Sequence, residues 1–229
     1  MANPGFSFEK KLWLQGHKYI IGLDEVGRGA LAGPVVVGAV VFPPTAKKLE
    51  GITDSAEKSK RLGIKIKDSK QLTALQREKA DGWIRKNALA CSTASLSAKT
   101  VDRLGIVKAT HSGFRRVVKS IQEQLGHPVN FVLIDAFYIP KLRAFPLLKN
   151  NRRQLAIIDG DAKCFTIASA SIVAKVYRDG LMKKLGERKK YQKYGWEKNK
   201  GYGTKFHQEA IKKYGVTSYH RKSFIHLTT

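Results

Sequence analysis

The chain is short of acidic residues and of cysteine, and each shortage narrows what the protein can be. Only 18 Asp and Glu stand against 43 Lys and Arg among its 229 residues, so the formal net charge is +25 at pH 7. A surface this basic attracts polyanions, which makes nucleic acid the first candidate partner and an anionic membrane the second. Charge alone does not exclude a basic protein that has neither partner.

The two cysteines, Cys91 and Cys164, provide neither a disulfide framework nor a metal-binding spacing. The first residues contain no signal-peptide apolar core, and the longest apolar stretch, residues 30–44, is too broken by glycine and proline to span a bilayer. We therefore expect a cytoplasmic protein with no membrane partner. The sequence also lacks an ATPase-type phosphate loop, and its six histidines form no H-E-x-x-H pair.

The length suits one sizeable domain over residues 1–229, and a hydrophobic content of 42% is ordinary for a globular protein. Apolar runs predict strands at residues 18–23, 34–42, 89–96, 131–134 and 155–158. Helical spacing predicts helices from about Thr73, over residues 100–125 and over residues 165–185. The first two strands are closely joined and favour antiparallel pairing, and later strands alternate with helices. This order predicts a mixed α/β sheet covered by helices.

The helix that starts near Thr73 has a capping-box spacing between Thr73 and Gln76. Its buried face is expected to comprise Leu75, Ala80, Trp83 and Ile84. In the helix predicted over residues 100–125, the buried set includes Val107. The lysine-rich residues 45–66 are interpreted as an exposed loop or flexible insertion.

Acidic side chains follow three of the apolar strands. They are Asp24 and Glu25 after the first strand, Asp135 after the fourth and Asp161 after the fifth. Neighbouring strands lie about 4.8 Å apart, and ligands of open α/β sheets bind beyond strand ends, so these carboxylates can converge. Clustered carboxylates repel one another unless a cation neutralises them, and a divalent ion with oxygen ligands is the natural partner. Any one of these acids alone is more commonly a turn or cap residue; together, in so acid-poor a chain, they favour a site.

The glycine-rich residues 27–32 match G-x-G-x-x-A, the dinucleotide-binding fingerprint. That fingerprint requires a helix directly after the glycines, whereas Pro34 and a valine-rich strand follow here, so a dinucleotide site is excluded. The glycines instead allow the backbone to approach a ligand closely, with Arg28 beside it. A plain glycine turn is the alternative.

The C-terminal stretch, residues 175–229, holds 15 Lys or Arg against 4 Asp or Glu and interleaves them with aromatic residues. Tyr202 lies between two glycines, where its ring can stack on a sugar or base or can simply pack. Asp179 and Lys183 have the spacing of a helical ion pair. Asp68, Ser69 and Lys70 form a polar lead-in to the helix at Thr73.

Several motifs in one order resemble bacterial ribonuclease HII. Residues 21–34 resemble the opening signature of that family, and the later matches cover residues 68–72, 134–135, 160–163, 167–179, 199–204 and 220–224. The resemblance extends over roughly residues 18 to 225. It implies a ribonuclease H-like fold with a five-stranded mixed sheet flanked by helices. The implied single catalytic domain has a core at about residues 17–182 and a basic C-terminal helical part at about residues 183–229.

The resemblance also implies an activity and a set of site residues. The family's four catalytic, metal-binding acids map onto Asp24, Glu25, Asp135 and Asp161, with Mn²⁺ or Mg²⁺ as the cofactor. Its G-R-G motif, which contacts the ribose 2′-hydroxyl, maps onto Gly27, Arg28 and Gly29, and its sugar-packing tyrosine maps onto Tyr202. Lys70 and Lys175 fall at positions that resemble basic residues near the phosphates.

The implied enzyme is a monomeric endoribonuclease that cuts the RNA strand of RNA–DNA hybrids. It also incises DNA 5′ of embedded ribonucleotides, leaving 5′-phosphate and 3′-hydroxyl ends. One rival is a non-catalytic nucleic-acid-binding module, which explains the charge but not the acids. A second is the sister family ribonuclease HIII, whose added N-terminal domain is not expected from the short lead-in to the first strand. Asp159 departs from the family pattern and places an extra negative charge near Asp161.

Overall fold

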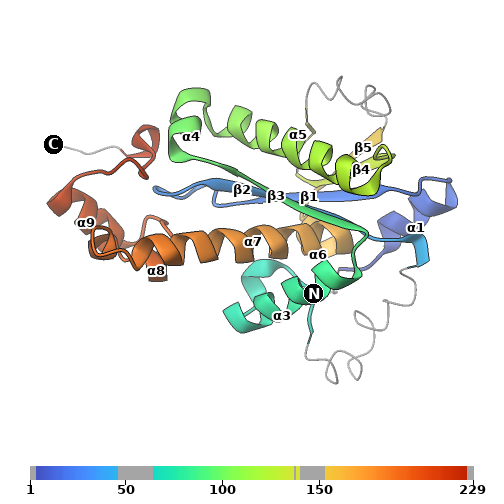
Figure 1. The fold of residues 1–229 in the computed structure, drawn as a ribbon, viewed down its shortest axis with the longest axis horizontal. Helices are drawn as coiled ribbons and strands as arrows, with labels where there is room; N and C mark the ends of the chain where they lie inside the picture. Colours follow the sequence, from blue (N-terminus) through green and yellow to red (C-terminus); the bar gives the residue numbers. More distant parts are fainter. Residues whose placement is uncertain (1–3, 46–63, 137, 140–152, 226–229) are drawn as a thin grey trace.

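A computed structural model describes residues 4–45, 64–136, 138–139 and 153–225 of the protein. Five strands form one sheet in the order β3-β2-β1-β4-β5 (Figure 1). The strands are β1 (Ile20–Val26), β2 (Val35–Val41), β3 (Ala90–Leu96), β4 (Phe131–Asp135) and β5 (Gln154–Ile157). The first three pair antiparallel, while β4 runs parallel to β1 and β5 runs parallel to β4. This confirms the predicted mixed sheet and the antiparallel first pair.

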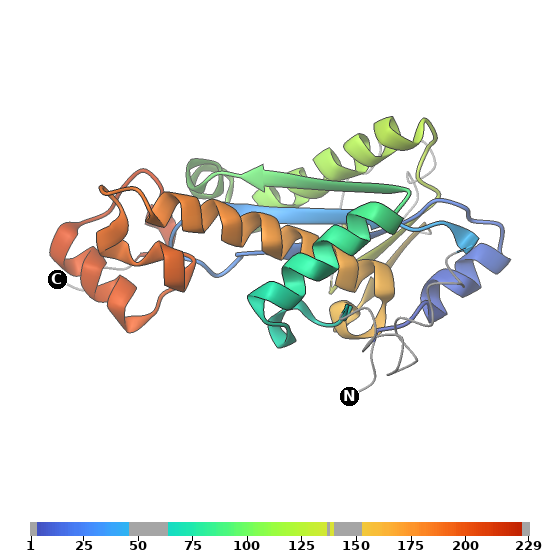
Figure 2. The same cartoon turned by 60° about the horizontal axis from the view of Figure 1, so that its bottom comes forward.

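Helices cover both faces of the sheet (Figure 1). One face carries α4 (Ala98–Leu104) and α5 (Ile106–Leu125), and the other carries α3 (Ala74–Asn87) and α7 (Phe165–Gly186). The short helix α6 (Gly160–Lys163) leads into α7. The α1 helix (Ser7–Leu14) lies at one end of the molecule, as Figure 2 also shows.

The C-terminal part continues from the far end of α7. It comprises the 3-10 turn η6 (Gln192–Tyr194), α8 (Trp196–Asn199), α9 (Lys205–Tyr214) and the 3-10 turn η7 (Lys222–Phe224). The boundary expected near residue 182 falls inside α7, so this helix is shared by the core and the C-terminal part. The division of residues 1–229 into those two parts stays a prediction.

Both faces of the sheet are buried, which explains the near-continuous valine run of β2, where all seven residues are buried. Packing of α7 onto the sheet is close because two strand positions lack side chains. A Cβ at Gly38 would lie 2.2 Å from the Ala170 carbonyl oxygen, and one at Gly22 would lie 2.4 Å from the Thr166 carbonyl carbon. These glycines therefore allow α7 to pack closely against β1, which carries Asp24 and Glu25, and against β2.

Some local predictions hold and others are wrong. Thr73 caps α3 with the predicted reciprocal bonds to Gln76. The helix predicted over residues 100–125 is two helices, because Gly105 adopts φ +76° between them. Leu75 and Val107 were expected to be buried but are 62% and 48% exposed, and they lie outside the buried sets of α3 and α5.

The loop predicted over residues 45–66 falls largely outside the described residues. At its end, Ile66 is only 3% exposed and packs in the core beneath α7, so that part is not an exposed loop. Among the residues that the structure describes, none of the helices is long and apolar enough to cross a membrane.

Candidate active site

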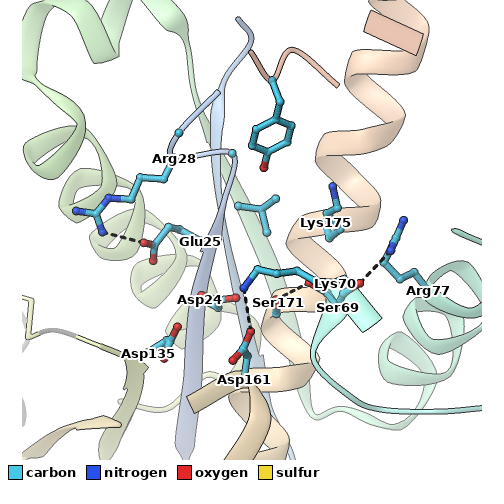
Figure 3. A pocket seen from close by; sticks show the side chains of 14 residues that line it. Asp24, Glu25, Arg28, Ser69, Lys70, Arg77, Asp135, Asp161, Ser171 and Lys175 are labelled. Atoms are coloured by element: carbon cyan, nitrogen blue, oxygen red, sulfur yellow. Dashed lines mark hydrogen bonds and ion pairs between the residues drawn. The ribbon is translucent and has the colours of Figure 1, made fainter. Parts of the chain in front are cut away.

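One pocket of about 650 Å³ brings together all ten residues that the sequence predicts for the site (Figure 3). Its lining comprises Asp24, Glu25, Val26, Gly27, Arg28, Gly29, Ser69, Lys70, Arg77, Asp135, Asp161, Ser171, Lys175 and Tyr202. These residues come from segments that are far apart in the sequence. The role of each predicted residue stays a prediction, but their placement in one pocket is a property of the fold.

The pairing of β1 with β4 explains why two of the acids meet. Leu23 is in register with Ile134, so Asp24 and Asp135 are the next residues along neighbouring parallel strands. Successive side chains of a strand point to opposite faces. Figure 3 accordingly shows Asp24 turned toward α7 and Glu25 turned toward Arg28.

Asp161 reaches the pocket differently from the sequence prediction. It does not end a strand but lies in the first turn of α6, beyond the end of β5 at Ile157. The chain turns between these elements at Asp159, which adopts a left-handed conformation with φ +55°. The Asp159 side chain is largely exposed, and its carboxylate lies 3.8 Å from Lys163 Nζ.

Burial makes the pocket acids resist ionisation. Asp24 is only 6% exposed, and its pKa lies well above the usual value because burial and then the charge of Glu25 oppose its own charge. A hydrogen bond from Ser171 only partly offsets this. Burial likewise raises the pKa of Glu25 and of Asp161, and Asp135 adds to both effects.

Cationic side chains and an amide presently hold three of the carboxylates. Arg28 Nη1 lies 3.1 Å from Glu25 Oε1, and Lys70 Nζ lies 3.6 Å from Asp161 Oδ2. Burial opposes the charge of Lys70, but the attraction of Asp161 and other nearby acids outweighs it and raises the Lys70 pKa. The Gly160 amide donates to Asp135 Oδ1 at 2.8 Å.

The carboxylate oxygens of this pocket are suitable ligands for a divalent cation, although the acids do not surround a single ion position in this structure. Across the described ranges of the chain, no group of three or more acidic, histidine or cysteine side chains is close enough to hold an ion as it stands. The charges of Glu25 and Asp135 nevertheless add to the burial that raises the pKa of Asp24, and the charge of Asp135 adds to the raised pKa values of Glu25 and Asp161. Oxygen ligands of this kind suit Mg²⁺ or Mn²⁺. Binding an ion would require Arg28 and Lys70 to release their carboxylates.

Two buried arginines hold the glycine-rich loop between β1 and β2. Arg178 of α7 donates to the carbonyl oxygens of Pro34 and Ala32 at 2.9 and 3.2 Å. Arg221 donates to those of Gly33 and Arg28 at 3.0 and 2.8 Å. Both arginine side chains are fully buried, so their hydrogen bonds to the loop carbonyls hold the loop conformation from the protein interior.

The two glycines of the G-R-G motif serve different purposes. Gly27 has φ +84°, and a Cβ there would lie 2.0 Å from Arg178 Nε, so glycine is required by the fold. Gly29 has open space around its missing Cβ and lines the pocket. The Arg28 carbonyl points to Arg221, and because the peptide unit is planar and trans, the Gly29 N–H points away from Arg221.

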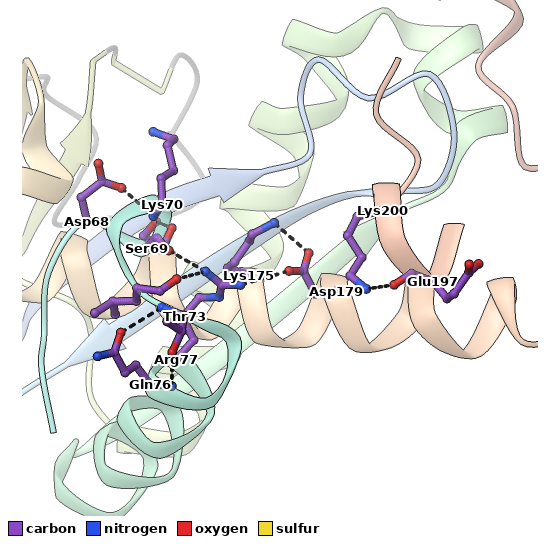
Figure 4. A network of polar contacts seen from close by, with 12 residues as sticks. Asp68, Ser69, Lys70, Thr73, Gln76, Arg77, Lys175, Asp179, Glu197 and Lys200 are labelled. Atoms are coloured by element: carbon purple, nitrogen blue, oxygen red, sulfur yellow. Dashed lines mark hydrogen bonds and ion pairs between the residues drawn. The ribbon is translucent and has the colours of Figure 1, made fainter. Parts of the chain in front are cut away.

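Tyr202 also lines the pocket, and its ring lies beside two cationic side chains. Arg178 Cζ lies 5.2 Å and Lys175 Nζ 5.8 Å from the centre of its ring. Figure 4 shows Lys175 bound to Asp179, at 2.8 Å, and Arg77 reaching the same carboxylate at 3.8 Å. Asp179 therefore pairs with Lys175 and Arg77 instead of the Lys183 that its spacing suggested.

The pocket is also lined by four residues that the sequence analysis did not assign to the site. They are Val26, Ser69, Arg77 and Ser171. Ser69 and Ser171 are hydrogen bonded at 3.0 Å, which links the turn carrying Lys70 to α7 and Asp24. Both serines lie inside segments that resemble the family, so the motifs themselves were the available signal. No sequence signal pointed to Arg77. It enters the site only through tertiary contacts, with the Ser69 carbonyl and with Asp179 of α7.

Two solved structures similar to this fold are ribonucleases. The ribonuclease H2 of Pyrococcus horikoshii OT3 superposes with a TM-score of 0.65 at 25% identity and covers 90% of this chain and 93% of its own. The Mn²⁺ complex of Bst-RNase HIII has a TM-score of 0.65 at 20% identity, covering 90% of this chain and 67% of its own. Fold and carboxylate pocket together define the class as ribonucleases with the ribonuclease H-like fold.

The sequence comparison identifies the family within that class. The family model for ribonuclease HII matches residues 21–227. The ribonuclease HII of Ruegeria pomeroyi is 41% identical over 224 residues, which is 98% of this chain and 83% of that protein. The chain therefore belongs to the ribonuclease HII family, and it is a ribonuclease H endonuclease that acts on RNA–DNA hybrids with a divalent metal.

Proposed function

We propose that this enzyme also incises duplex DNA on the 5′ side of single embedded ribonucleotides. It leaves 5′-phosphate and 3′-hydroxyl ends. The observation that carries the proposal is the position of the G-R-G loop and Tyr202 in the same pocket as the four acids. A site that recognises one ribose directly beside the catalytic acids does not need a long RNA strand.

Asp24, Glu25, Asp135 and Asp161 are proposed to hold two divalent cations, Mn²⁺ or Mg²⁺. When bound, such ions supply a nucleophilic water at neutral pH and stabilise charge on the leaving oxygen. The proposal is supported by the raised pKa values of Asp24, Glu25 and Asp161, which burial causes first and neighbouring carboxylate charges increase. A bound cation would offset both effects by stabilising the ionised carboxylates.

Recognition of ribose is proposed to use the G-R-G loop. The 2′-hydroxyl is the group that distinguishes RNA from DNA at the sugar. The Gly29 N–H is turned away from Arg221 at a position that lines the pocket, and the missing side chain lets a sugar approach. Arg28, once released from Glu25, adds a second donor beside it.

Tyr202, Lys175 and Lys70 are proposed to orient the strand that is cut. The Tyr202 ring packs on the sugar next to the scissile bond. Lys175 and Lys70 neutralise phosphate oxygens, and each lies at the pocket with its ammonium group beside a carboxylate that a phosphate can replace. A complete pocket within one chain supports action as a monomer, and the two unpaired cysteines suit the reducing cytoplasm.

The test uses a labelled DNA duplex with one ribonucleotide, a uniform RNA–DNA hybrid and an all-DNA duplex. Each is incubated with the enzyme and Mn²⁺, Mg²⁺ or a chelator. We expect cleavage of the first two with either ion, a single cut 5′ of the lone ribonucleotide, and a 3′-hydroxyl that a polymerase extends. Cleavage of the hybrid with no cut at the lone ribonucleotide would refute the proposal while leaving ribonuclease H activity intact.

A further inference from the structure

Two buried histidines of the C-terminal part contact each other, and one of them contacts the Tyr202 backbone. His207 of α9 is fully buried and His220 is 2% exposed. Their Nε2 atoms are 3.2 Å apart, and the Trp196 indole nitrogen donates to His207 Nε2 at 3.0 Å. His207 Nδ1 lies 2.9 Å from the carbonyl oxygen of Tyr202.

These contacts assign the protons of both rings. A carbonyl oxygen only accepts, so His207 Nδ1 must carry a hydrogen and donate it to Tyr202. The Trp196 N–H only donates, so His207 Nε2 carries a lone pair. The contact between the two Nε2 atoms therefore requires His220 to donate from Nε2. His220 Nδ1 is then an acceptor, in agreement with the Thr217 N–H that donates to it at 2.9 Å.

Both rings are neutral in this arrangement. A second proton on either histidine would place an N–H group against another donor. The pKa values agree in direction: burial lowers that of His207, and burial together with the positive charge that a protonated His207 would carry lowers that of His220 to about 4. The pair thus forms a fixed hydrogen-bonded chain from Thr217 through both rings to Tyr202.

The backbone on both sides of Tyr202 is held in place. The Leu31 and Ala32 amides donate to the Gly201 carbonyl at 2.9 and 3.0 Å. On the other side, His207 holds the Tyr202 carbonyl. With both peptide planes held, the direction in which the Tyr202 side chain leaves the backbone is set. His220 also precedes Arg221, which holds the Arg28 carbonyl, so one buried segment supports both features that face the ribose.

We propose that His207 is a positioning residue for ribose recognition, and that His220 fixes the tautomer in which it works. Through its Nδ1–H, His207 holds the Tyr202 backbone and thereby places the Tyr202 ring against the sugar beside the cut. This inference rests on the proposed role of Tyr202 in the function above.

The test compares two substitutions that each keep one half of the imidazole. In His207→Asn the amide nitrogen replaces Nδ1 and can still donate to Tyr202. In His207→Gln the amide oxygen replaces Nε2 and can still accept from Trp196 and His220, but the donor to Tyr202 is lost. We expect His207→Gln to lower kcat about tenfold on the duplex with one ribonucleotide, with little change in KM. His207→Asn should keep most of the rate.

A double-mutant cycle separates positioning from general damage. In a Tyr202→Ala background, His207→Gln should lower kcat no further, because the ring that it positions is absent. Equal losses in the Asn and Gln variants, or a tenfold loss that persists without the Tyr202 ring, would overturn the proposal. Thermal unfolding of each variant shows whether it is folded.

A measurement on the unaltered enzyme tests the proton assignment without any substitution. Two-bond ¹H–¹⁵N correlation spectra of histidine-labelled protein at about pH 7 should show His207 protonated only at Nδ1 and His220 only at Nε2. A His207 Nε2–H tautomer, or a doubly protonated ring, would overturn the proposal. These spectra do not depend on cleavage, so they also judge the histidine pair if the lone ribonucleotide proves not to be a substrate.

Discussion

Asp24 is the pocket residue whose charge the fold opposes most. It is buried on β1, hydrogen bonded to Ser171, and faces the charges of Glu25 and Asp135. Without a cation, these features destabilise the folded protein whenever Asp24 is ionised. An acidic residue that destabilises the folded protein in this way is expected to serve function and not stability.

Asp24→Asn should therefore abolish cleavage while leaving hybrid binding largely intact. In the presence of a chelator at about pH 7, it should also raise the melting temperature by about 2–4 °C, the shift that roughly 1 kcal/mol gives in a chain of this length. Calorimetry and a cleavage assay measure the two effects. Full activity in the variant would refute the metal-binding role of Asp24.

The pH dependence of that stabilisation has a definite sign. The pKa of Asp24 is raised in the folded state, so its contribution to stability is present at low pH and is lost as pH rises through the folded-state pKa. The advantage of Asp24→Asn over the unaltered protein should thus be absent in acid and grow toward neutral pH. An advantage that shrinks as pH rises would show that Asp24 is stabilised as a carboxylate.

Gly29 offers a residue-scale test of the ribose site. No heavy atom lies within 4 Å of a Cβ added there, so Gly29→Ala should fold with a melting temperature close to that of the unaltered protein. The added methyl group would occupy the place proposed for the sugar, so we expect at least a tenfold loss in kcat/KM, about 1.4 kcal/mol.

Gly180→Ala is the matched control for this substitution. It lies in α7, also has open space around its Cβ, and should raise stability by about 1 kcal/mol because alanine favours the helix. Its cleavage activity should be unchanged. A Gly29→Ala variant as active as this control would remove Gly29 from the site.

At the scale of elements, α1 is attached to the start of α7 by a buried acid that the sequence did not single out. Glu9 Oε1 accepts from the Thr166 amide, the Thr166 hydroxyl and the Cys164 thiol, at 2.9, 2.7 and 3.2 Å. Burial raises the pKa of Glu9 despite these bonds. Cys164 makes no side-chain cap of its own for α7, so Glu9 supplies the acceptor from outside the helix.

Glu9→Leu should destabilise the protein by about 2–4 kcal/mol, because it leaves the two Thr166 donors buried without an acceptor. Glu9→Gln keeps an oxygen at the position of Oε1 and removes the buried charge, so it should cost much less. Urea unfolding measures both. Equal destabilisation by the two variants would show that packing volume, and not the hydrogen bonds, attaches α1.

The elements that could be predicted were those with local signals. The valine run of β2, the capping box at Thr73 and the apolar run of β4 each depend on neighbouring residues only. The break at Gly105 was missed because the apolar spacing continues across it, although the chain turns there with a positive φ. The exposure of Leu75 was missed because spacing alone does not say where the buried face of a helix ends.

Across the whole molecule, the sequence allowed the acids of the pocket to be predicted, but not the buried side chains that hold the neighbouring loop in place. Asp24, Glu25 and Asp135 come directly after apolar runs, a pattern visible in the sequence itself, although the structure places Asp24 and Glu25 inside β1 and Asp135 at the end of β4. Arg221 acts on the Arg28 carbonyl across 193 positions of the sequence, and such a contact has no local signature. Arginine side chains are mostly exposed in folded proteins and histidines are intermediate, so residue type alone did not mark Arg221, His207 or His220 as buried.

The charge of +25 gives a prediction for the entire surface. Binding of a hybrid should weaken about 100-fold or more between roughly 50 and 200 mM salt, the loss expected when about four or more phosphate contacts release counterions. Fluorescence anisotropy in a chelator measures binding without cleavage. Affinity that barely changes with salt would show that the basic surface does not contact phosphates.

We infer that four acids, brought to one pocket by β1, β4 and α6, share divalent cations. A crystal structure of the enzyme with Mn²⁺ and a non-cleavable hybrid tests it most directly through the anomalous signal of manganese. We expect anomalous peaks among Asp24, Glu25, Asp135 and Asp161, with Lys70 displaced from Asp161. Manganese bound elsewhere, with Lys70 and Arg28 still on their carboxylates beside the bound hybrid, would contradict it.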